Sequence, residues 1–261
     1  MSFYGKTLII SGLMMILILT MIILIQSRTE RYHCKPVVIK KIKKIKKKQK
    51  PRFKFKLSDP RQMMPEPRLL TGFLSEEEVN ALIEESDKHG FHISMVEDNR
   101  QDKKVRVSET CWLYPDKIPT LAKIYQRVLA LPYIQSNNEE EQYTLEPLQV
   151  VKYGSGGHYS SHYDQCYDDM PYCKKQMKDF NGPRKWTLIM YLTDEYDGGE
   201  TYFPNLNRHI KGQKGDALLF HTLTMDNTMV HPLSLHQGSE VSNGEKRIAN
   251  VWIRTNAVDF W

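Results

Sequence analysis

The stretch Leu148–Asp164, LQVVKYGSGGHYSSHYD, decides the fold of this 261-residue chain. It begins with a β-rich run, Leu148–Tyr153, and passes through a glycine-rich turn to His162-Tyr163-Asp164. A run of this length that ends at turn residues is typical of a β-strand. In an extended segment, side chains at positions i and i+2 point to the same face. If His162 and Asp164 are extended, this stretch predicts a pair of metal ligands aimed at one point.

The rest of the C-terminal half is also rich in residues that are typical of β-strands. Further short apolar runs follow at Trp186–Leu192, Ala217–Phe220 and Ile248–Arg254. Turn signals separate the runs at 154–157, 197–199, 214–216 and 243–244,. The chain after Glu146 is therefore expected to form many short strands.

Two helices are expected before these strands. Ser75-Glu-Glu-Glu78 is a capping box, an apolar stripe follows it, and Gly90 is a plausible stop,. The second candidate, Ile118–Leu131, carries apolar side chains on one face,. Helices followed by many strands predict the α+β class, here a double-stranded β-helix (jelly roll) buttressed by N-terminal helices.

The N-terminal region has a separate character. Thr7–Gln26 contains no charged residue, and roughly 20 apolar residues span a bilayer as one helix,. A cleaved signal peptide has a shorter apolar region that ends at small residues, so an uncleaved transmembrane anchor is favoured. The expected organisation is a lead (1–6), the transmembrane anchor (7–26), a basic juxtamembrane linker (27–58) and a catalytic domain (59–261) with its core at 147–256.

The basic linker explains the positive charge of the chain. Arg31–Lys56 holds 13 Lys and Arg residues and no acidic residue, so the net charge of +6 becomes 6 − 13 = −7 for the remainder. Such a segment attracts anionic headgroups by about 1 kcal/mol per basic residue. Nucleic-acid binding is the alternative. A solvated spacer beside the membrane is favoured, because the segment directly follows the anchor.

The four cysteines are Cys34, Cys111, Cys166 and Cys173. Cys166 and Cys173 flank a polar stretch just after the His-x-Asp pair and would staple that loop in an oxidising lumen. Free thiols in a cytosolic domain are the alternative. Zinc binding is less expected, because no CxxC spacing occurs.

A third metal ligand would complete a facial triad of two histidines and one carboxylate, which leaves positions on Fe(II) open for oxygen and substrate. Four downstream histidines are candidates: His209, His221, His231 and His236. Spacing alone does not choose well among them. His236 is favoured because Lys246 follows it, adding a cation for a dicarboxylate co-substrate, and a β-rich closing strand comes next.

The segment from Gln149 to Arg254 resembles the catalytic domain of prolyl 4-hydroxylases, which are iron- and 2-oxoglutarate-dependent dioxygenases. The resemblance is carried by 150–164, TLIMYL (187–192), GGETYFP (198–204), KGDALLF (214–220) and SLHQG (234–238). The overall layout is similar to that of compact, membrane-anchored members from plants, algae and large DNA viruses.

The resemblance implies a role for individual residues. The iron ligands would be His162, Asp164 and His236, and Lys246 would bind 2-oxoglutarate ten positions after the distal histidine. Supporting co-substrate contacts would come from Tyr153, Thr187 and Trp252, and substrate contacts from Tyr159 and Arg106. Two departures from the family pattern bear on substrate fit: Arg247 replaces the family's usual aromatic residue, and the loop Gln165–Pro183 is longer than usual.

The function implied is 4-hydroxylation of peptidyl proline with Fe(II), O2 and 2-oxoglutarate, releasing succinate and CO2, with L-ascorbate as reductant. Lys246 favours this assignment, because lysyl hydroxylases and nucleic-acid demethylases of the superfamily use arginine there. An oxygenase acting on peptidyl lysine or nucleic acid is one alternative, and a catalytically idle membrane-tethered binding protein is another. The family favours a catalytic domain in the endoplasmic reticulum lumen, whereas the positive-inside rule favours the cytosol.

Overall fold

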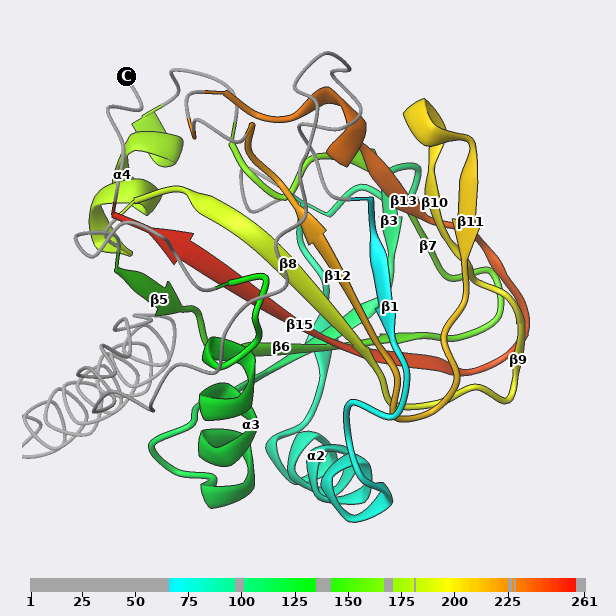
Figure 1. Cartoon of the computed structure of the whole chain (residues 1–261). Coiled ribbons are helices and arrows are strands. Elements are labelled where there is room, and N and C mark those ends of the chain that lie inside the picture. Colours follow the sequence, from blue (N-terminus) through cyan, green and yellow to red (C-terminus); the bar gives the residue numbers. More distant parts are fainter. Residues whose placement is uncertain are drawn as a thin grey trace, which may run out of the picture. The chain divides into compact units, whose positions relative to one another are not determined.

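The computed structural model describes residues 66–96, 101–134, 142–166, 171–180, 182–224, 227 and 229–256. The expected lead (1–6), transmembrane anchor (7–26) and basic linker (27–58) lie outside these residues. Within the described ranges, no helix combines the length and the apolar character needed to cross a bilayer. Figure 1 shows the arrangement of the elements.

A large antiparallel sheet forms the framework. Its strand order is β1-β12-β8-β15-β6-β4-β2, and β5 also pairs with β15. The strands are β1 (Arg68–Leu70), β2 (His92–Ile93), β4 (Glu109–Leu113), β5 (Tyr143–Leu145), β6 (Leu148–Tyr153), β8 (Arg184–Tyr191), β12 (Ala217–His221) and β15 (Lys246–Thr255). The four apolar runs expected to be strands are β6, β8, β12 and β15, with small differences at their ends.

A smaller sheet carries the two histidines of the predicted ligand set, His162 and His236. Its order is β11-β10-β13-β7-β3. These strands are β3 (Arg106–Val107), β7 (His158–His162), β10 (Thr201–Phe203), β11 (Arg208–Ile210) and β13 (His236–Gly238). In addition, β9 (Tyr196–Gly198) pairs with β14 (Val241–Gly244). Short 3₁₀ helices occupy Pro204–Leu206 and Pro232–Ser234.

Both expected helices are present. In α2 (Glu76–His89), the Ser75 side chain accepts a hydrogen bond from the Glu78 backbone, and the Glu78 side chain accepts one from the Ser75 backbone. This capping box satisfies two of the amides that a helix start leaves unpaired. Gly90 follows the helix with a φ of 77°, a conformation that glycine adopts without strain,. The second helix, α3 (Pro119–Leu129), buries Leu121, Ile124, Tyr125 and Val128.

Strand alternation divides the interior into two cores. Leu188 and Met190 of β8 pack with the buried faces of α2 and α3. The residue between them, Ile189, packs on the other side with Phe203 of the small sheet. Successive side chains of a strand point to opposite faces, which explains this division. The large sheet therefore has helices on one face and the small sheet on the other (Figure 1).

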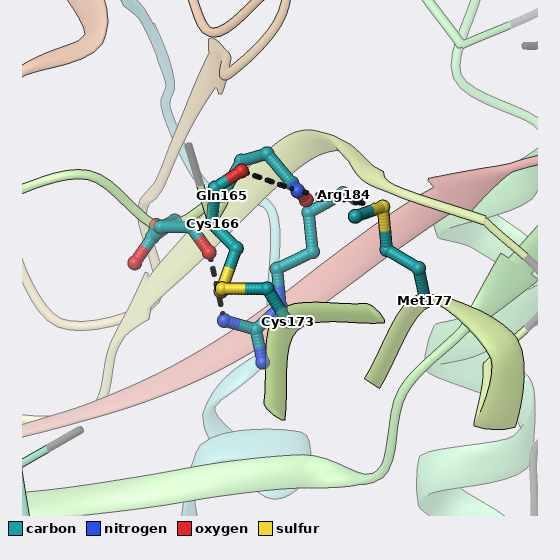
Figure 2. Close-up of a disulfide and its surroundings, with 6 residues drawn as sticks. Gln165, Cys166, Cys173, Met177 and Arg184 are labelled. Atoms are coloured by element: carbon teal, nitrogen blue, oxygen red, sulfur yellow. Dashed lines mark hydrogen bonds between the residues drawn. A yellow bond between two sulfur atoms is a disulfide. The ribbon is translucent and has the colours of Figure 1, made fainter. Parts of the chain in front are cut away.

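The long loop after Asp164 holds an element that the sequence did not predict. A short helix, α4 (Pro171–Asp179), lies within it. Cys166 and Cys173 form a disulfide across this loop, with their Cα atoms 5.7 Å apart (Figure 2). Cys111 is buried and free, and Cys34 lies outside the described residues. Of the two alternatives for Cys166 and Cys173, the structure thus contains the disulfide and not free thiols.

Candidate metal centre

Three predicted ligands converge between the sheets. His162 ends β7 and His236 begins β13, and the antiparallel pairing sets these two residues directly opposite each other. Asp164 lies two residues past the end of β7, in a bend rather than within the strand. One ligand atom from each of the three residues lies within 4.8 Å of the others. Pairing of β7 with β13 is thus what selects His236 as the third member.

The two imidazole rings are oriented for metal binding. Nδ1 of His162 lies 2.8 Å from the Ser160 carbonyl oxygen, and Nδ1 of His236 lies 3.0 Å from that of Ser234. A carbonyl can only accept, so each Nδ1 carries a proton, and in the neutral ring Nε2 then keeps the lone pair that binds a metal. The Nε2 atoms face Asp164, at 3.7 Å and 3.8 Å from its two oxygens. Metal-binding histidines are usually held by such a bond on the other ring nitrogen.

The protonation states also suit a divalent cation. Burial and the neighbouring His162 lower the pKa of His236 to about 4, so its ring is neutral at pH 7. Burial alone would raise the pKa of Asp164, but the nearby His236, His162 and Arg184 outweigh it and hold that pKa well below its usual range. Two imidazoles and one carboxylate match the donor set that Fe(II) accepts in facial-triad sites.

Asp164 has its own supports. The Thr187 hydroxyl donates to Asp164 Oδ2 at 2.6 Å, and Arg184 Nη1 donates to the Asp164 backbone oxygen at 2.9 Å. Thr187 was expected to contact the co-substrate; in this structure its hydroxyl is hydrogen-bonded to the Asp164 carboxylate, at the edge of the same centre. Phe220 packs edge-on against the ring of His236, so the centre has an apolar wall on that side.

Lys246 is a buried cation close to these ligands. It starts β15 opposite Tyr153 and is only 2% exposed. Its ammonium group donates to the Gly199 carbonyl at 2.6 Å, and no carboxylate in the described ranges forms an ion pair with it. Burial lowers the pKa of Lys246 to about 8. An anionic ligand would relieve the cost of burying this charge.

The other predicted co-substrate residues line the same face of the large sheet. Trp252 pairs directly with Thr187 across β15 and β8, and its indole Nε1 is buried with no hydrogen-bond partner among the described residues. Burial raises the pKa of Tyr153, although the nearby side chains of Arg106 and Ser108 oppose that rise. A buried donor without a partner among the described residues, such as Trp252 Nε1, is consistent with a ligand-binding site,.

The two predicted substrate residues stack beside the centre. The ring of Tyr159 lies on that of His162, with a centroid separation of 3.6 Å and a 20° angle. The Arg106 guanidinium lies 4.6 Å from the centroid of the Tyr159 ring. The structure therefore brings Arg106 and Tyr159 next to a proposed ligand.

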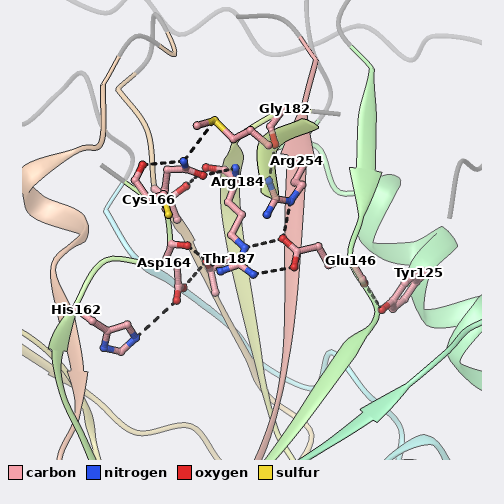
Figure 3. A network of polar contacts seen from close by, with 12 residues as sticks. Tyr125, Glu146, His162, Asp164, Cys166, Gly182, Arg184, Thr187 and Arg254 are labelled. Atoms are coloured by element: carbon pink, nitrogen blue, oxygen red, sulfur yellow. Dashed lines mark hydrogen bonds and ion pairs between the residues drawn. The ribbon is translucent and has the colours of Figure 1, made fainter. Parts of the chain in front are cut away.

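A buried ionic network that the sequence patterns did not predict lies behind Asp164 (Figure 3). Glu146 is 2% exposed and accepts from Arg184 Nε at 2.6 Å and from Arg184 Nη2 at 2.7 Å. Arg254 Nε also donates to Glu146 at 2.6 Å, and the Tyr125 hydroxyl donates to the Glu146 backbone oxygen. The signal available in the sequence was an arginine at or near one end of each of two strands, Arg184 at the start of β8 and Arg254 near the end of β15.

The remaining histidine candidates lie apart from the centre. His209 stacks on Tyr202, His221 lies against Trp186, and the His231 side chain accepts from the Leu233 backbone. None of the three belongs to the metal-ligand group found among the described residues.

Arg247, the expected departure at the substrate site, faces the helices instead. Its guanidinium forms ion pairs with Asp87 at 2.9 Å and Glu245 at 3.0 Å, and lies 5.3 Å from the Phe91 ring. Because Lys246 and Arg247 are adjacent in a strand, they point to opposite faces. The arginine is therefore accommodated by contacts next to α2, away from the face that carries Lys246.

Comparisons with known proteins agree with this geometry. The model of the 2OG-Fe(II) oxygenase superfamily matches residues 148–254. A protein of Acanthamoeba polyphaga mimivirus, named as a prolyl 4-hydroxylase, is 37% identical over 153 residues, which is 59% of this chain and 60% of the relative. A protein of Arabidopsis thaliana named as prolyl 4-hydroxylase 6 is 31% identical over 216 residues, or 74% of this chain and 70% of the relative.

A solved structure is also similar. The viral collagen prolyl hydroxylase of Paramecium bursaria Chlorella virus-1, in its 2OG complex, has 32% sequence identity and a TM-score of 0.55. The match covers 72% of this chain and 95% of that one. The chain thus corresponds to most of that viral enzyme, but to only 60% and 70% of the two curated relatives.

Proposed function

Because this chain belongs to the 2OG-Fe(II) oxygenase superfamily, we propose that it hydroxylates peptidyl proline at the 4-position, converting 2-oxoglutarate and O2 to succinate and CO2. The observation that carries the proposal is the convergence of His162, Asp164 and His236 near a buried lysine that lacks an anionic partner in the described ranges. The triad suits a ferrous ion, and the lysine suits a dicarboxylate.

The three ligands would hold Fe(II) on one side and leave its other positions open. When bound, Fe(II) supplies the oxidative chemistry that couples decarboxylation of 2-oxoglutarate to C–H hydroxylation. The protein contributes placement. The Ser160 and Ser234 carbonyls fix the ring nitrogens, and the Thr187 hydroxyl orients Asp164.

Lys246 would bind the far carboxylate of 2-oxoglutarate, a charge-assisted contact stronger than a neutral hydrogen bond. Its charge already influences the metal ligands, because it contributes to lowering the pKa of His236. Tyr153 and Trp252, which lie on the same face of the sheet, would contact the co-substrate. Burial of the lysine excludes water, which strengthens its attraction for an anion.

The substrate would be a proline-containing polypeptide, as the names of the relatives suggest. Tyr159 is partly buried and stacks on His162, so a proline ring bound against it would lie beside the metal. The Arg106 guanidinium also lies against the Tyr159 ring, and it would donate a hydrogen bond to the peptide backbone. L-ascorbate is proposed as the reductant, on the family resemblance alone.

Several finer assignments belong to the same proposal. The two sheets enclosing the site support a double-stranded β-helix buttressed by α2 and α3. The catalytic domain is taken as 59–261 with its core at 147–256, after a lead (1–6), an anchor (7–26) and a basic linker (27–58).

The Cys166–Cys173 disulfide favours a single-pass protein with its domain in the endoplasmic reticulum lumen, because disulfides persist in oxidising compartments,. Protection of that domain from protease in sealed microsomes tests the orientation.

The activity is tested by succinate release with Fe(II), 2-oxoglutarate and a panel of proline-rich and collagen-like peptides, with mass spectrometry of the products. We expect a mass gain of one oxygen on proline. His162→Ala should abolish turnover, whereas His209→Ala, outside the centre, should keep it. Product found only on lysine or on a nucleic-acid base would refute the substrate assignment, and full turnover by His162→Ala would refute the site.

A further inference from the structure

The three ligands of the centre are not held in the same way. His162 and His236 belong to paired strands, so the hydrogen bonds between β7 and β13 fix their backbones. Asp164 lies beyond the end of β7 and has no place in that ladder. Its position must therefore depend on contacts outside the sheet.

One set of contacts comes from the next residue, Gln165, which is 1% exposed. Its side-chain oxygen accepts from the Arg184 backbone amide at 2.7 Å. Its amide nitrogen donates to the Cys166 carbonyl at 2.8 Å and lies 3.9 Å from the sulfur of Met177 on α4 (Figure 2). Gln165 thus ties the chain beside the metal carboxylate to the start of β8 and to α4.

The disulfide completes this connection. Cys166, two residues after Asp164, is bonded to Cys173 within α4, and both cysteines are buried. A further contact comes from β8, where the Arg184 guanidinium donates to the Asp164 backbone oxygen and is itself paired with Glu146 (Figure 3). The segment 164–166 is therefore clamped between β8 and a helix that is covalently attached to it.

We propose that the Cys166–Cys173 disulfide, together with Gln165, is a positioning device for Asp164 that raises the affinity of the centre for its metal ion. The inference rests on the proposed function, since it assigns Asp164 as a metal ligand. Partners that orient metal ligands typically contribute about 10- to 100-fold to metal affinity. The disulfide does not touch the metal or the substrate and acts only through the backbone that it shares with Asp164.

The test is anaerobic titration of the full chain with Co(II), a spectroscopic substitute for Fe(II), followed by its visible absorption and by calorimetry. The test variants are Cys166→Ala/Cys173→Ala and, with the disulfide intact, Gln165→Leu. Cys111→Ala is the matched control, because Cys111 is a buried thiol on β4 outside the network. We expect both test variants to bind Co(II) about tenfold or more weakly, and the control to bind as wild type does.

A cycle of variants separates positioning from general loss of structure. Because the disulfide and Gln165 act on the same backbone, the triple variant should lose less affinity than the product of the two separate losses. Urea unfolding without metal gives the folded fraction of each variant, and the Co(II) affinity is corrected for it. If the double variant does not fold, Gln165→Leu still tests the proposal.

Wild-type affinity in both test variants would overturn the inference, as would losses that vanish after correction for the folded fraction. Failure of the proposed function has a different signature. In that case wild type and His162→Ala would bind Co(II) equally, which would also remove the basis of the inference.

Discussion

Replacing Lys246 with methionine should stabilise the ligand-free protein while abolishing its response to 2-oxoglutarate. Methionine has a similar length and no charge, so it fills the space of the buried lysine stem. The pKa of Lys246 falls from 10.5 to about 8 on folding, which corresponds to a cost of about 3 kcal/mol for holding the charged form at pH 7. The substitution removes this cost.

The substitution also removes one hydrogen bond. The Gly199 carbonyl would lose the donor that now lies 2.6 Å away, at a cost of about 1–2 kcal/mol. The net expectation is a gain of about 1–2 kcal/mol in the free energy of unfolding at pH 7. Because the folded-state pKa is depressed, the penalty in wild type fades as the pH rises from about 8 to 10.5, so the advantage of Lys246→Met should shrink across that window,.

Urea unfolding with Mn(II) present, with and without 2-oxoglutarate, measures both effects. A ligand at one hundred times its Kd should stabilise wild type by about 2.7 kcal/mol and the variant by nothing. Lys214→Met is the control, because Lys214 is exposed and its ion pair with Glu76 spans 3.6 Å, so its effect should stay within about 0.5 kcal/mol. A Lys246→Met protein that is less stable than wild type, or that 2-oxoglutarate still stabilises, would refute the reasoning.

Three further predictions concern charge. The affinity for 2-oxoglutarate should fall about tenfold per pH unit above roughly pH 8, because unliganded Lys246 then loses its proton,; calorimetry showing constant affinity from pH 7 to 9.5 would contradict this. Glu146→Gln should lower the free energy of unfolding in urea by about 3–5 kcal/mol, because it leaves two buried guanidinium groups without a full counter-charge,. The control, Glu109→Gln, removes a more exposed ion pair and should lower it by less than about 1 kcal/mol,. Equal losses of stability in Glu146→Gln and Glu109→Gln would show that burial of the ion pair does not determine the cost. Arg247→Ala should reduce stability by about 1 kcal/mol through its lost contacts beside α2,, yet leave the KM for peptide and co-substrate unchanged in steady-state assays; a raised KM would place it at the site after all.

Local signals in the sequence predicted much of this fold. The capping box at Ser75 and the apolar stripe of 118–131 depend on neighbours three or four residues apart, and α2 and α3 formed where these patterns predict. The apolar runs became β6, β8, β12 and β15 for the same reason. The convergence of His162 and Asp164 also follows from short spacing, although Asp164 turned out to lie just outside its strand.

What the sequence did not predict depends on contacts between distant residues. Glu146, Arg184 and Arg254 form one buried network, although 108 residues separate the first from the last. Each looks like an ordinary surface charge until β8 and β15 are paired. The choice of His236 among four histidines likewise needed the pairing of β13 with β7, or the family resemblance. The helix α4 has only nine residues and a polar composition, and it was missed.

The ten-residue strand β15 has a consequence for how this protein can change over time. It pairs with β5, β6 and β8, and it presents Lys246 and Trp252 to one face and Arg247 to the other. An insertion or deletion of a single residue near its start would exchange the faces of Lys246 and Arg247, placing a guanidinium in the pocket and an ammonium under α2. We therefore expect changes in the lengths of surface loops to be tolerated, and a change in the length of this strand to disable the site.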